Sequence, residues 1–161
     1  RMTKENGGCK WNMEYVINLV RELVTKHGTC DPIKIAKLEN IKIEYDFYEE
    51  TKGYFIKILE YKYIVINQQL NYFLALFVIA HELAHALMHS DNFLVMKYEK
   101  GVYHSTSHDV FISNCIYEKE ANLFAIQLLK NYFKEYQASL PEELKDILTK
   151  YQAYTNECIH R

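Results

Sequence analysis

Three histidines and one glutamate stand in the most apolar stretch of the chain, V-I-A-H-E-L-A-H-A-L-M-H, which covers residues 78–89. Burying ionisable side chains is costly unless a partner compensates their charges and hydrogen bonds. A bound metal cation is one such partner, and a satisfied polar network is another. The types and the spacing of these residues indicate which of the two to expect.

His81, Glu82 and His85 form the pattern H-E-x-x-H. Residues four apart lie on one face of an α-helix, so both imidazoles can reach a single zinc ion. Glu82 projects to the side, where it can hold a water molecule and take its proton. Zinc lowers the pKa of a bound water towards about 7 and polarises a peptide carbonyl. The pattern therefore predicts hydrolysis of a peptide bond at a metal, with Glu82 as the general base.

A catalytic zinc ion needs a third protein ligand and one open position. One candidate is Glu118, because Asn122 follows it by four residues and one helical face can then offer a carboxylate to the metal and an amide to a ligand histidine. The other candidates are His104 and His108. A histidine as third ligand accompanies a longer H-E-x-x-H motif with a glycine soon after it, and residues 86–90 contain no glycine. We therefore favour Glu118.

Other polar residues near the motif receive lesser roles. His89 follows His81 by eight residues, which on an α-helix places it about 80° around the axis from His81. We therefore expect His89 at the helix end or beside a ligand. Glu120 points about 160° away from Asn122 on a helix and is interpreted as a surface charge. Three tyrosines are candidate donors to an oxyanion, and none is assigned a catalytic role: Tyr98, Tyr103 and Tyr117.

The elements that must position these residues can be read from periodicity. Apolar residues at helical spacing predict a first helix between Asn12, as N-cap, and Gly28, as its end. Asp31 followed by Pro32 predicts the start of a second, short helix. Alternating residues then predict three antiparallel strands at about residues 40–48, 53–59 and 62–67.

The second half of the chain is predicted to be mainly helical. From about Leu70 to His89 the run is apolar on nearly every side, which is typical of a helix buried all round. A long loop or a hairpin over residues 91–116 follows, then a helix from about Tyr117 to Tyr136 and a last helix opened by Pro141. The fold class is therefore α+β, with a small three-stranded antiparallel sheet packed on a helical core that carries the H-E-x-x-H helix.

We expect residues 1–161 to form a single domain, with residues 1–12 disordered or left over from cloning and residues 137–161 as a C-terminal helical extension. With 19 Lys and Arg against 21 Asp and Glu, the chain lacks the basic surplus of nucleic-acid-binding and membrane-binding proteins. Its cysteines are scattered and favour free thiols: Cys9, Cys30, Cys115 and Cys158. We expect a cytoplasmic protein that contacts neither nucleic acid nor membrane.

The H-E-x-x-H helix, followed by Y-E-K-E-A-N-L-F-A-I-Q-L-L at residues 117–129, resembles the ImmA/IrrE family of metallopeptidases. The stretch K-G-Y-F-I-K-I-L-E-Y-K-Y-I-V-I-N at residues 52–67 is similar to the segment ahead of that family's active-site helix. The resemblance implies a gluzincin-like site in which His81, His85 and Glu118 bind one zinc ion and Glu82 is the base. It also implies an intracellular protein of bacteria or their mobile elements that acts against a repressor.

The sequence leaves three hypotheses. The first is a zinc endopeptidase that cleaves a cytoplasmic regulatory protein, a phage or mobile-element repressor, with Asn122 and His89 supporting the ligand histidines. In this hypothesis the strand K-Y-I-V-I forms the sheet edge to which an extended substrate adds. The second is a metal-containing module that sequesters a repressor without proteolysis. The third is a helical scaffold without metal.

Overall fold

The structure, a computed structural model, describes residues 12–91 and 116–159, with side chains as far as residue 153. The element order is α1 (Met13–His27), α2 (Pro32–Leu38), β1 (Ile41–Asp46), β2 (Gly53–Ile58), β3 (Tyr61–Asn67), α3 (Tyr72–Ala84), η1 (His85–His89), α5 (Ile116–Glu135), η2 (Gln137–Ser139) and α6 (Glu142–Ile159). Helices pack on a small sheet, so the α+β prediction is confirmed. Residues 1–11 and the greater part of the predicted 91–116 loop lie outside the described residues.

Local signals in the sequence account for the first two helices. The side chain of Asn12 accepts a hydrogen bond from the Tyr15 N–H at 3.0 Å, and Gly28 ends α1 with a φ of 66°. At the start of α2, Asp31 accepts from the N–H of Ile33 at 2.9 Å. These caps satisfy backbone groups that a helix end leaves without partners. Both predicted helix starts are confirmed.

The sheet has the order β1-β3-β2, and it is mixed. β2 and β3 form an antiparallel hairpin, but β1 lies parallel to β3. The expectation of a fully antiparallel sheet is therefore wrong for β1, and β3, with the K-Y-I-V-I segment, is the central strand, so it cannot be the expected edge. Alternation of apolar residues determines which face of a strand is buried, but it does not determine which strand is its neighbour.

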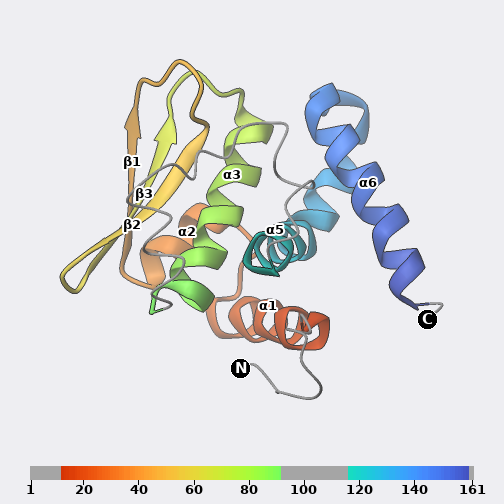
Figure 1. The fold of residues 1–161 in the computed structure, drawn as a ribbon, viewed down its shortest axis with the longest axis horizontal. Helices are drawn as coiled ribbons and strands as arrows, with labels where there is room; N and C mark the ends of the chain where they lie inside the picture. Colours follow the sequence, from red (N-terminus) through yellow and green to blue (C-terminus); the bar gives the residue numbers. More distant parts are fainter. Residues whose placement is uncertain (1–11, 92–115, 160–161) are drawn as a thin grey trace.

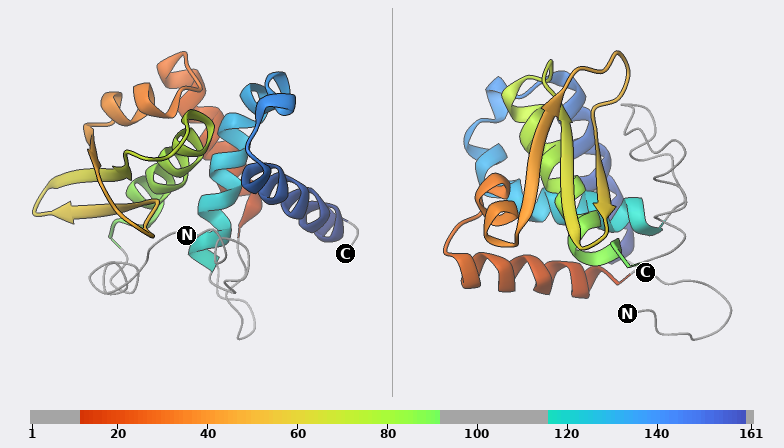
Figure 2. Two further views of the ribbon diagram at one scale, coloured as in Figure 1. Left: turned by 90° about the horizontal axis from the view of Figure 1, so that it is seen from above. Right: turned by 90° about the vertical axis from the view of Figure 1, so that its left-hand side faces the viewer.

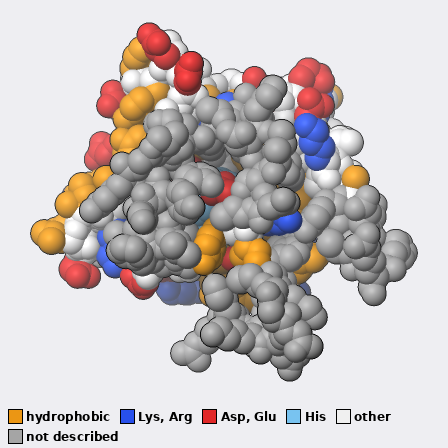
Figure 3. Space-filling model, in the orientation of Figure 1, with side chains coloured by type: hydrophobic (Ala, Val, Ile, Leu, Met, Phe, Trp, Pro, Cys, Tyr) orange, Lys and Arg blue, Asp and Glu red, His pale blue; other side chains and the backbone are white. Residues whose placement is uncertain are grey.

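The sheet and the helices form layers, with α3 lying between the sheet and α5 (Figure 1). β2 approaches α3 closely at Gly53, where an added Cβ would lie 2.7 Å from Val78 Cγ1. Seen from the side of the sheet, the strands lie in front and the helices behind them (Figure 2). Hydrophobic side chains gather along the margin of the molecule that the sheet occupies (Figure 3), and Ile58 and Tyr61 are among the exposed ones.

The helix that carries the H-E-x-x-H motif is the core of the domain. Every residue from Leu76 to Ala84 is buried, as predicted for this run. By length and composition Tyr72–His89 would also pass as a membrane span, but 72% of it is buried inside the molecule. The sequence predicts one continuous α-helix to His89, whereas the structure ends α3 at Ala84 and continues as a π-helical turn, η1.

Candidate metal centre

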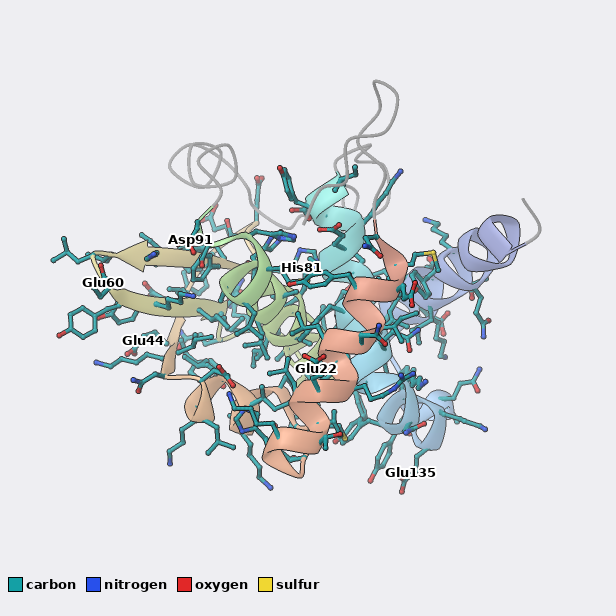
Figure 4. All side chains as sticks on the ribbon, turned by 90° about the horizontal axis from the view of Figure 1, so that it is seen from below. Glu22, Glu44, Glu60, His81, Asp91 and Glu135 are labelled. Atoms are coloured by element: carbon teal, nitrogen blue, oxygen red, sulfur yellow. The ribbon has the colours of Figure 1, made fainter. Side chains whose placement is uncertain are left out.

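Three side chains predicted as metal ligands meet in the interior. His81 lies in the last turn of α3, His85 begins η1, and Glu118 lies in the first turn of α5. Glu118 places one oxygen 3.1 Å from His81 Nε2 and the other 3.1 Å from His85 Nε2. The two Nε2 atoms are themselves 3.1 Å apart. Figure 4 shows the labelled His81 among the helices in the middle of the molecule.

This arrangement fits a small metal cation. The candidate ligand atoms of the three buried residues all lie within 4.8 Å of one another. In a tetrahedral zinc site with bonds of about 2.1 Å, neighbouring ligand atoms lie about 3.4 Å apart. Two imidazole nitrogens and a carboxylate also match the donors that zinc accepts in catalytic sites, with a fourth position left for water or substrate. The residues His81, His85 and Glu118 could therefore hold a metal ion.

Asn122 orients the first of these histidines. Its Oδ1 lies 2.8 Å from His81 Nδ1, and its side chain is 1% exposed. Because an amide oxygen only accepts hydrogen bonds, Nδ1 must carry the proton and Nε2 is left to face the metal position. The structure thus places Asn122 where the spacing with Glu118 predicts it, one turn further along α5.

His85 is oriented differently, through His89. The Nδ1 atoms of these two buried rings lie 2.9 Å apart, and His89 Nε2 lies 2.9 Å from Glu120 Oε2. The side chain of Glu120 is 15% exposed, so its interpretation as a surface charge is wrong. Helical periodicity missed this contact because it measures directions around one helix, whereas the contact joins two elements, η1 and the start of α5.

The π-helical turn reduces the angle around the helix axis between His89 and His81. The predicted angle of about 80° assumes 3.6 residues in each turn. A π-helix bonds residue i to i+5 and has more than four residues in each turn. Each residue therefore rotates less around the axis, and His89 lies closer to the face that carries His81. Lys62 of β3 donates to the Ala86 carbonyl of this turn at 2.7 Å. This hydrogen bond therefore links β3 to the turn that carries His85 and His89.

Glu82 lies near two of the three candidate ligands, His81 and Glu118, and is 5% exposed. Burial and the nearby Glu118 carboxylate raise its pKa to about 7, against the opposing effects of His81 and of a hydrogen bond from the Phe55 backbone. A carboxylate whose pKa lies near neutrality is suited to accept and return a proton. Phe55 belongs to β2, so the carboxylate lies between the H-E-x-x-H helix and an edge strand.

The charges of the ligands are strongly coupled in the metal-free protein. Burial lowers the pKa of His81, but the carboxylate of Glu118 outweighs it, and the net pKa is raised to about 9. Burial lowers the pKa of His85 to about 4 despite the same carboxylate. The pKa of Glu118 falls well below its usual range because the attraction of the two histidines exceeds the effect of burial. These shifts favour a protonated His81 paired with an ionised Glu118 when no metal ion is bound.

The remaining sequence candidates are only partly visible. His104 and His108, the alternative ligands, lie outside the described residues, and so do Tyr98 and Tyr103. The ring of Tyr117 packs edge-on against the His89 ring, with centroids 5.0 Å apart. Among the described residues, His81, His85 and Glu118 are the group that could hold a metal ion.

Comparison with known proteins agrees with this geometry. The peptidase M78 family model, described as IrrE N-terminal-like domain, matches residues 33–156. A similar protein, "Uncharacterized immunity region protein 2" of Bacillus phage phi105, is 33% identical over 111 residues, which are 68% of this chain and 65% of the length of that protein. Since the family match covers most of the chain and includes the three clustered side chains, the chain belongs to the IrrE N-terminal-like family of peptidases, as its motifs predict.

Proposed function

We propose that the chain is a zinc-dependent endopeptidase that cleaves a cytoplasmic regulatory protein, most specifically a transcriptional repressor of a phage or mobile element. The observation that carries the proposal is the buried group of His81, His85 and Glu118 with the Glu82 carboxylate beside it. A structural zinc site is closed by four protein ligands and has no use for a neighbouring base. The similarity to a protein named for a phage immunity region supports a regulatory substrate.

The residues of the chain divide the chemistry among themselves. His81, His85 and Glu118 would hold the ion, which when bound supplies Lewis-acid polarisation and makes water more acidic. Glu82 orients the attacking water and takes its proton, then returns the proton to the leaving amine. Asn122 keeps the Nε2 atom of His81 aimed at the metal position. The apolar wall of α3 keeps bulk water away and strengthens these charge interactions.

The substrate chain is proposed to add to the outer edge of β2. This strand is one edge of the sheet, and its Phe55 backbone bonds to Glu82. An extended peptide that pairs with an edge strand acquires main-chain hydrogen bonds and a defined direction. At β2 such a peptide would run past the general base.

The decisive experiment uses Glu82→Gln in the full chain, because glutamine preserves the shape of the side chain and removes the base. We expect the variant to bind zinc as the parent does and to lose cleavage of the proposed repressor substrate by at least about 100-fold, the lower range for a general base. Fragments are followed on a gel and zinc by elemental analysis. Exposed Glu135→Gln is the matched control and should cleave normally.

Two results would reject the proposal. If purified parent protein binds no stoichiometric zinc, the metal assignment is wrong. If Glu82→Gln still releases the repressor from its operator as well as the parent, without fragments from either protein, the chain acts by sequestering the repressor.

A further inference from the structure

A chain of hydrogen bonds leads away from the metal position and ends at a residue outside the ligand set. It runs from His85 through His89 to Glu120, with successive N···N and N···O separations of 2.9 Å. His89 is 3% exposed, so water has little access to its ring. His85 and His89 belong to η1, and Glu120 lies near the start of α5.

With a metal ion on Nε2 of His85 and with His89 in its neutral form, the chemistry of the three groups allows one assignment of protons. A carboxylate only accepts hydrogen bonds, so the Nε2 of His89 donates to Glu120. The Nδ1 of a neutral His89 is then a lone pair, and it accepts from the Nδ1–H of His85. With that nitrogen protonated, the lone pair of His85 lies on Nε2, the atom 3.1 Å from the Glu118 carboxylate. Each proton position determines the next one.

We propose that Glu120 is a positioning residue for the metal ligand His85 and that it acts through His89. Outer partners of this kind fix the tautomer and the ring orientation of a ligand histidine, and their loss typically costs about 10- to 100-fold in metal affinity. For His81, the hydrogen bond to Asn122 fixes the tautomer and the ring orientation directly. The two ligand histidines are thus held by two different devices, a single amide and a histidine–carboxylate pair.

This proposal rests on the proposed function, because it assumes that the site binds zinc. Zinc binding by the parent protein tests the proposed function, and the change in zinc affinity of the variants tests the role of Glu120. We expect Glu120→Ala in the full chain to bind zinc about 10- to 100-fold more weakly than the parent in competition with a chelator. Glu120→Gln, whose amide oxygen can still accept from His89, should retain most of the affinity. Glu135→Ala, at the exposed end of the same helix and far from His81 in Figure 4, should bind as the parent does.

A double-mutant cycle tests whether His89 is the intermediate. In a His89→Phe background, which keeps a ring against Tyr117 but removes the nitrogens, the further change Glu120→Ala should cost no additional zinc affinity. An equal cost in both backgrounds would overturn the relay. Unchanged zinc binding by Glu120→Ala, in a parent that binds zinc, would also overturn it, whereas a parent that binds none would overturn the proposed function instead.

A spectroscopic measurement needs no variant and does not depend on folding of the mutants. Nitrogen-15 NMR of the imidazoles in the zinc-loaded parent should report a proton on Nδ1 of His85 and on Nε2 of His89. A proton on Nδ1 of His89 would reverse the direction of the His85–His89 bond and contradict the proposal.

Discussion

Two opposing effects act on the pKa of His81, and the result couples its protonation to metal binding. Burial disfavours the imidazolium, and the Glu118 carboxylate at 3.1 Å favours it and prevails. His85 meets the same carboxylate but stays neutral, because burial and the neighbouring His81 charge prevail there. The metal-free group therefore holds one proton that a metal ion must displace.

This argument predicts the proton release on metal binding. At pH 7.5 we expect about one proton to leave for each zinc ion bound, since the pKa of His81 is raised to about 9 and that of His85 is lowered to about 4. Apparent zinc affinity should rise about tenfold per pH unit up to about pH 9 and level off above it. Calorimetry in buffers of different ionisation enthalpy measures the proton count. A count near zero at pH 7.5 would contradict the imidazolium.

Among the elements, the π-helical turn η1 has the clearest consequence for the site. It contains His85 and His89, whose Nδ1 atoms lie 2.9 Å apart, and its Ala86 carbonyl accepts a hydrogen bond from Lys62. Burial lowers the pKa of Lys62 more than its charged neighbours raise it. Its ammonium nevertheless donates to a carbonyl in the last turn of the helix, where carbonyls lack helical partners, so β3 helps to hold the turn in place.

We predict that Lys62→Met, which keeps the length and the apolar stem, lowers the free energy of unfolding of the metal-free protein by about 1.5–3 kcal/mol, the range for a lost hydrogen bond to a charged donor. Urea denaturation provides the measurement. Lys34→Met, at an exposed position of α2, is the matched control and should change little. Equal stability of the Lys62 and Lys34 variants would show that the bond to Ala86 is dispensable.

For the domain, the site is a junction between two helices that pack through aromatic rings. Phe77 of α3 contacts Phe133 of α5 at a centroid distance of 6.5 Å, and it contacts the His81 ring at the same distance. Glu118 lies at the other end of α5. A metal ion would therefore join α3 and α5 at the end opposite to this aromatic contact.

Metal binding should therefore stabilise the fold. At free zinc of 100 times the dissociation constant, linkage predicts about 2.7 kcal/mol of added stability. For a domain of this size that corresponds to a rise in Tm of about 5–10 °C. Scanning calorimetry with and without EDTA measures the shift. Glu118→Gln should fold and show a much smaller one, and a full shift in that variant would place the metal elsewhere.

Particular residues show how far sequence reasoning reached. The caps at Asn12 and Asp31 and the buried run of α3 are local or periodic signals, and the structure reproduces them. His81, His85, Glu118 and Asn122 were named from spacing, and the structure brings them together. Glu120 was misjudged because its partner, His89, lies 31 residues away along the chain. No pattern within one helix can report a contact to another.

The sequence alone predicted which residues form the candidate site, because four-residue spacing and apolar periodicity are properties of single helices. The tertiary structure decided the parallel pairing of β1, the central place of β3, the π-helical turn and the path from His85 to Glu120. Each of these features depends on contacts between segments that are far apart in the chain. A strand or a buried polar group has several possible partners, and a local sequence pattern does not show which of them gives the lowest free energy.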